Sequence, residues 1–174
     1  MGEDENKKRE RRHQEDLERL RGFRPIDDTF MRGLFKENIP LAELVLRIIT
    51  GKPDLVLLKC ETQADMKRVT GARSVCLDAY ATDSTGKKYD IEVQRSDNGA
   101  DPHRARYHSS MLDIEYRDNS DIGRLMHDFN CTNASDMYFD LLAEKTRYLK
   151  ENPKGVNEMC KVMEDLRNES YAEG

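Results

Sequence analysis

A short polar turn between two β-type segments constrains this chain more than any other feature. The residues Ser84 to Lys87 (STGK) separate Ser74–Thr82 (SVCLDAYAT) from Lys88–Gln94 (KYDIEVQ). Both flanking segments are rich in β-branched and aromatic residues, and a glycine-containing turn of this length typically joins two antiparallel strands. The sequence therefore predicts a β-hairpin, and with it a protein that contains a β-sheet.

Alternation within the hairpin determines which side chains share a face. Ile91 and Val93 point one way, so Glu92 and Gln94 point the other. If the two strands pair as expected, Asp78 shares the face of Glu92. Two converging carboxylates make a hard-oxygen site that suits Mg²⁺ or Mn²⁺, and the main-chain carbonyl of Val93 is a third candidate ligand. Gln94 would lie beside a metal-bound water and orient it by hydrogen bonding.

The same alternation has a simpler interpretation. Half-buried antiparallel strands routinely carry acidic residues on their solvent face, where they are only hydrated. From spacing alone this interpretation is favoured, and both stay open at this point.

Helical patterns surround the predicted strands. Asp27, Asp28 and Thr29 can cap a helix that runs to Phe35, and a second helix is expected from Pro40 to Gly51. Further segments are expected as a strand at 55–60 and as helices at 101–113, 137–149 and 156–166. We expect a single domain over residues 23–174, with a helical C-terminal region over about 120–170.

Residues 1–22 form a charged N-terminal extension that mixes both signs. Leu17 and Leu20 are too few to fill a core, so the sequence predicts a solvated helix or a disordered segment. The alternative is a contact with nucleic acid through the basic side chains of Lys7, Lys8, Arg9, Arg11 and Arg12.

Composition excludes some classes of protein. The net charge of -5 argues against a bulk-basic nucleic-acid binder, although not against transient cleavage of DNA in a local cleft. No apolar run approaches the ~20 residues of a membrane span. The four cysteines form no CxxC motif, so we expect reduced thiols in a cytoplasmic protein.

One further group of candidate ligands stands near the C-terminal half. His127, Asp128 and Cys131 lie within about one helical turn. His and Cys at i and i+4 can bind zinc, but a closed zinc site takes four ligands. No second pair is near in the sequence, so a structural role is the favoured interpretation.

The block from Ser74 to Asp113 resembles the PD-(D/E)XK nuclease family transposases, bacterial proteins related to recombination-promoting nucleases. Their pattern is an Asp on a short apolar strand, a hairpin, an (I)E-x-Q strand, and a helix that bears Arg and Tyr. Here LDAYATD supplies Asp78, DIEVQR supplies Glu92 and Gln94, and HRARYHSSMLD supplies Arg104, Arg106 and Tyr107. Similar segments upstream and downstream extend the resemblance over most of Phe23–Glu169.

The resemblance implies an α/β fold with a restriction-endonuclease-like αβββαβ core, whose mixed sheet is flanked by helices. It implies a Mg²⁺- or Mn²⁺-dependent DNA endonuclease linked to transposition or recombination. Asp78 and Glu92 would hold the metal, and Gln94 would take the position of the usual lysine. The residues implied at the phosphate are Arg104 and Arg106, and the weaker supporting candidates are Tyr107 and Glu43. For Glu43, an exposed helix residue is the alternative interpretation. A homodimer would let two copies meet both DNA strands.

The chain departs from the family after Asp113. Where relatives carry a strongly apolar strand, SSMLD runs almost directly into IEYRDNSDIGRL. Loss of a core strand would leave an unpaired sheet edge. The alternative function is therefore a non-catalytic remnant that acts as a DNA-binding or protein-interaction module.

Overall fold

The computed structural model describes residues 2–62, 79–94, 111–113 and 119–173. Within these ranges the protein is a mixed α/β structure in which helices predominate. Its strands are β1 (Leu57–Thr62), β2 (Ala79–Asp83), β3 (Lys88–Gln94) and β4 (Met111–Asp113), and they form one sheet in the order β1-β2-β3-β4.

The sheet has antiparallel and parallel neighbours. β2 pairs antiparallel with β1 and with β3, and Ala79 stands opposite Ile91 in the β2–β3 pair. β4 runs parallel to β3, with Glu92 opposite Met111. The predicted hairpin is confirmed from Ala79 onward, and β3 begins and ends at the predicted residues. The first part of the predicted strand, including Asp78, lies outside the described residues.

The short strand β4 corrects one expectation. We expected a helix over 101–113, but Met111–Asp113 pairs with the last residues of β3 instead. Pairing gives the main chain of β3 a hydrogen-bonding neighbour, and such tertiary pairing overrides a weak local pattern of three residues. Residues 101–110 lie outside the described ranges.

Two short helices cover one face of the sheet. Helix α2 (Asp28–Phe35) begins at the predicted cap, although the Asp27 carboxylate accepts from Arg24 N at 2.7 Å rather than from the helix. In α3 (Ile39–Thr50) the Asn38 side chain accepts from the main-chain N–H of Leu41. Gly51 ends α3 with a φ of 65°, a left-handed conformation that glycine adopts without strain.

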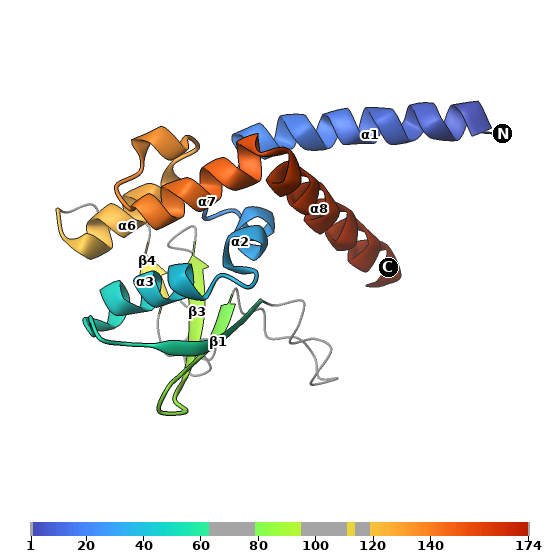
Figure 1. The fold of residues 1–174 in the computed structure, drawn as a ribbon. Coiled ribbons are helices and arrows are strands. Elements are labelled where there is room, and N and C mark those ends of the chain that lie inside the picture. The colour runs from blue at the N-terminus through green and yellow to red at the C-terminus, as the bar shows by residue number, and fades with distance from the viewer. Residues whose placement is uncertain (1, 63–78, 95–110, 114–118, 174) are drawn as a thin grey trace.

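Three helices form an outer layer, namely α6 (Asp121–Asn130), α7 (Asp140–Glu151) and α8 (Pro153–Glu173). A single 3₁₀ turn, η1 (Ala134–Asp136), precedes α7. Helix α2 contacts β1 on one side and α7 and α8 on the other, while α3 contacts β1, α6 and α7. The pair α2–α3 is thus a middle layer between the sheet and the C-terminal helices (Figure 1).

The N-terminal segment forms helix α1 (Gly2–Gly22), and its last turns are part of the fold. Leu20 is only 2% exposed and belongs to the hydrophobic core. The buried carboxylate of Asp16 accepts two hydrogen bonds, of 2.6 and 2.8 Å, from the Arg167 guanidinium in α8. The expected solvated extension therefore holds for residues 5–15, which are exposed, but not for the end of α1.

Lys150 joins three segments at one point. Its ammonium donates to the main-chain carbonyls of Arg21, Phe23 and Thr132, which bring the end of α1 and the loop after α6 onto α7. Burial lowers the pKa of Lys150, although the charge of Asp27 opposes that change.

Among the described helices, none combines the length and the apolar character that a membrane span requires.

The close approach of α7 and α8 yields a stability prediction. In Gly155→Ala, the new Cβ would overlap the main-chain carbonyl of Tyr148, which cannot move aside as a flexible side chain can. We expect overpacking to lower the free energy of unfolding by about 1–3 kcal/mol. The better helix propensity of alanine returns at most about 1 kcal/mol. Urea unfolding measures the difference.

Gly22→Ala is the matched control, because a Cβ at Gly22 meets nothing within 4 Å. This variant should unfold at the same urea concentration as the wild type or a higher one. Equal stability of both variants would contradict the packing of α8 against Tyr148.

Candidate functional site

The structure places only part of the expected metal site. Glu92, Val93 and Gln94 are the last three residues of β3, and β4 is their neighbour in the described sheet. Their side chains are not described. The remaining expected site residues lie outside the described ranges, and these are Asp78, Arg104, Arg106 and Tyr107.

Glu43 is partly buried, so it is not the exposed helix residue that the alternative interpretation expected. Its carboxylate accepts from Leu57 N at 2.7 Å and from Arg47 at 3.3 Å, and its side chain is only 17% exposed. Leu57 pairs with Asp83, at the end of β2 remote from Ala79. Four residues of strand span about 13 Å. Glu43 therefore ties α3 to β1 at the end of the sheet remote from Ala79, and its role as a supporting acid stays a prediction.

Asp83 organises the turn that presents β3. One carboxylate oxygen accepts from Thr85 N at 2.9 Å, from the Thr85 hydroxyl at 2.7 Å and from Lys87 N at 2.9 Å. The other accepts from the Tyr89 hydroxyl at 2.9 Å. These bonds, above all the one from the Thr85 hydroxyl, lower the pKa of Asp83 to about 2. We did not single out Asp83 from the sequence, although Asp before a Ser-Thr-Gly turn is a known signal.

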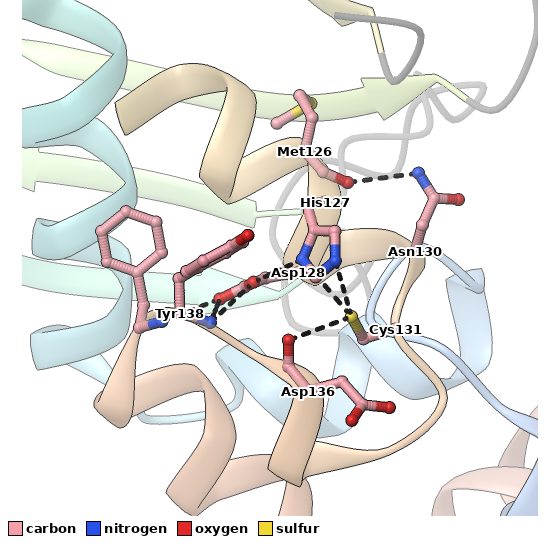
Figure 2. Close-up of polar contacts among 8 residues, drawn as sticks. Met126, His127, Asp128, Asn130, Cys131, Asp136 and Tyr138 are labelled. Atoms are coloured by element: carbon pink, nitrogen blue, oxygen red, sulfur yellow. Dashed lines mark hydrogen bonds and ion pairs between the residues drawn. The ribbon is translucent and has the colours of Figure 1, made fainter. Parts of the chain in front are cut away.

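A second group of candidate ligands gathers where α6 ends. One ligand atom each from His127, Asp128 and Cys131 lies within 4.8 Å of the other two. The His127 Nδ1 is 3.1 Å from the Asp128 carboxylate and 3.6 Å from the Cys131 sulfur. Figure 2 shows the imidazole ring between that carboxylate and that sulfur. We call these three residues the α6 cluster.

The carboxylate of Asp128 joins α6 to the start of α7. Asp128 is fully buried, and its oxygens accept from the main-chain N–H groups of Tyr138 and Phe139 at 2.9 Å. Phe139 is the N-cap residue of α7 and has no capping side chain of its own. Asp128 therefore supplies the acceptor and the negative charge that a helix N-terminus favours.

The other two members of the α6 cluster are more accessible. The His127 ring packs against the Tyr138 ring at a centroid distance of 4.8 Å. Burial raises the pKa of the Cys131 thiol to about 11, and the charges of Asp128 and Asp136 add to this. Without a cation nearby, Cys131 is therefore a protonated thiol at neutral pH.

Comparisons with known proteins give no relative for this chain, because no protein-family model, curated protein or solved structure matches it.

The turn at Asp83 predicts a pH dependence of stability. The pKa of Asp83 is about 2 in the folded protein and near 3.8 when the group is free. Its stabilising contribution is therefore complete above pH 3.8 and is lost as the pH falls towards 2. Asp83→Asn should lower the thermal midpoint at neutral pH, and the gap to the wild type should close over that acidic range. A gap that does not change with pH would contradict the role of the ionised carboxylate.

The Asp128 bridge predicts a graded loss of stability. Asp128→Ala leaves the N–H groups of Tyr138 and Phe139 without their acceptor, so we expect a loss of about 2–4 kcal/mol in the free energy of unfolding. Asp128→Asn keeps one acceptor oxygen and should lose less. His127→Ala is the control, since it leaves both main-chain bonds intact. If urea unfolding shows equal losses for Asp128→Ala and His127→Ala, the bridge does not act as described.

Proposed function

We propose that this chain is a metal-dependent DNA endonuclease of the PD-(D/E)XK kind, whose metal site lies on the β2–β3 hairpin. The order of elements is the observation that carries the proposal. Helix α3 precedes three antiparallel strands, and β4 then adds to β3 in parallel. These elements agree with the first helix, the three strands and the last strand of the expected αβββαβ order. The second helix of that order would fall within residues 95–110, which lie outside the described residues. The connection over residues 95–110 exceeds the roughly dozen residues that a parallel crossover needs.

The register of the hairpin supports a shared site for the two carboxylates. Ala79 stands opposite Ile91. If the same register continued by one residue, Asp78, which lies outside the described residues, would pair with Glu92. Residues directly opposite each other in an antiparallel pair share a face, with Cβ atoms about 4.5–5.5 Å apart. Carboxylates at that separation can hold one ion between them.

The alternation of side chains along β3 also supports a site that DNA can reach. Ala81 and Tyr89 are paired and buried, so their face of the hairpin is the one that the helices cover. Position 92 has the opposite parity from Tyr89 and belongs to the other face. A substrate as large as DNA would thus approach the hairpin from the side away from α2 and α3.

The donor set fits the proposed metal. The carboxylates of Asp78 and Glu92 and the carbonyl of Val93 are hard oxygen donors, which Mg²⁺ and Mn²⁺ prefer. A bound ion would polarise the scissile phosphate and lower the pKa of a water molecule. Gln94 would orient that water by hydrogen bonding, since an uncharged amide cannot take its proton.

The remaining residues would position the substrate. Arg104 or Arg106 would contact the scissile phosphate, for which the planar guanidinium fork is well suited. Tyr107 lies next to them in the sequence and would support that contact. Because the net charge is -5, DNA binding would depend on such local contacts, and a homodimer would bring two sites to the two strands.

A non-catalytic remnant is the second candidate function. One observation on the sequence favours it, namely that SSMLD runs almost directly into IEYRDNSDIGRL after Asp113. Such a chain would keep the motif by descent and act as a DNA-binding or protein-interaction module.

Cleavage of plasmid DNA tests the proposal. We expect nicking by the wild type in Mg²⁺ or Mn²⁺, none after chelation, and a reduction of about 100-fold or more in the double variant Asp78→Asn, Glu92→Gln. These isosteric changes remove the charges with little change in shape. Asp54→Asn, which changes an exposed acid outside the strands, is the control and should cut normally.

Thermal melting of each variant checks that a loss of nicking does not come from a loss of the fold. Equal nicking by the wild type and the double variant would mean that the two carboxylates do not carry the activity. Folded wild type that fails to nick in either metal would leave the remnant as the better candidate.

A further inference from the structure

The α6 cluster combines three kinds of side chain that bind zinc. Imidazole nitrogen, thiolate sulfur and carboxylate oxygen are the usual protein ligands of Zn²⁺. His127 and Cys131 are four residues apart at the end of α6, so both lie on one side of the chain, and Asp128 points to the same place (Figure 2). From these residues we infer that the α6 cluster binds one Zn²⁺ ion, a site separate from the one proposed on the hairpin.

Two of the three distances between the ligand atoms are close to those that a zinc ion requires. With Zn–S near 2.3 Å and Zn–N near 2.0–2.1 Å, tetrahedral geometry separates neighbouring ligand atoms by about 3.3–3.6 Å. The His127 Nδ1 is 3.6 Å from the Cys131 sulfur and 3.1 Å from the Asp128 carboxylate. The third pair, the Asp128 carboxylate and the Cys131 sulfur, lies within 4.8 Å, so a zinc ion would have to draw these two atoms together by up to about 1.3 Å.

Neighbouring groups hold the ligands in place, as they do in established metal sites. The Asp128 carboxylate is fixed by the amides of Tyr138 and Phe139, and the His127 ring is held against the Tyr138 ring. An ionised carboxylate has about four lone-pair positions. The two amides occupy at most three of them, which leaves one position, on the oxygen that faces His127, for a cation.

The choice of metal follows from the ligands. Thiolate and imidazole favour Zn²⁺ over Mg²⁺, which prefers oxygen ligands and water. One thiolate and one carboxylate would also neutralise the charge of the ion next to a buried residue. Three protein ligands leave a fourth position that a water molecule fills.

Binding requires the loss of one proton. The Cys131 thiol is protonated at neutral pH, so its S–H bond breaks, the proton passes to solvent, and a Zn–S bond forms. Uptake of one ion should therefore release about one proton. Calorimetric titrations with Zn²⁺ in two buffers of different ionisation enthalpy measure this number.

Titration of the metal-free full-length chain with Co²⁺ and Zn²⁺ tests the site directly. Co²⁺ bound by a thiolate gives a charge-transfer band in the near ultraviolet. We expect a band that saturates at one ion per chain for the wild type and is displaced by Zn²⁺. Cys131→Ser should abolish the band, and His127→Ala should weaken binding by about tenfold or more. Asp128 stays unchanged because it holds α7.

Cys160→Ser is the matched control. The Cys160 sulfur also lies 3.9 Å from a histidine nitrogen, that of His13, but this pair belongs to no group of three ligands in the described part of the chain. The control should bind Co²⁺ as the wild type does. The inference is overturned if the wild type gives no thiolate band, if Cys131→Ser keeps it, or if Cys160→Ser loses it.

Discussion

Burial of the α2–α3 pair on two sides is the constraint on which the rest of the structure depends. Phe30, Phe35, Leu41 and Leu46 are all fully buried in these short helices, and a fully buried side chain of this kind contributes about 1.5–3 kcal/mol. The sheet covers one side of the pair, so the outer helices must cover the other. Gly33 allows this, since a Cβ there would overlap the Met159 sulfur of α8. The hairpin is thus supported by helices that lie far from it in the sequence.

The two proposed metal sites lie on opposite sides of this middle layer and differ in chemistry. The proposed hairpin site would offer hard oxygen donors, which suit an ion that activates a phosphodiester. The α6 cluster offers nitrogen, sulfur and oxygen at the junction of α6 and α7, where Asp128 already orders the main chain. An ion there would strengthen a junction of the outer layer, whereas an ion on the hairpin would take part in a reaction. The ligand types therefore distinguish the two proposed sites by the metal ion that each would prefer.

Local patterns predicted much of the fold, and long-range contacts account for what they missed. Alternation located β3 to the residue, and the sequence also indicated the proline in the first turn of α3 and the glycine at its end. The burial of Leu20 could not be predicted, because the end of α1 packs against α8, which lies far away in the sequence. The ion pair between these helices joins Asp16 to Arg167, 151 residues later. The sequence also indicated the close spacing of the three residues of the α6 cluster. It did not indicate that Asp128 accepts from main-chain amides, because these amides lie ten and eleven residues away. Spacing alone gave no reason to expect the strand at 111–113.

The claim at the centre of this account is that one divalent ion binds at the hairpin, and NMR with paramagnetic Mn²⁺ tests it most directly. At Mn²⁺ concentrations below that of the protein, the amide signals of Ala79, Ile91 and Val93 should broaden first, while those of residues 127–131 stay sharp. The broadening should disappear in Asp78→Asn, Glu92→Gln. Sharp hairpin signals in the folded wild type, or broadening centred on α6, would contradict the claim.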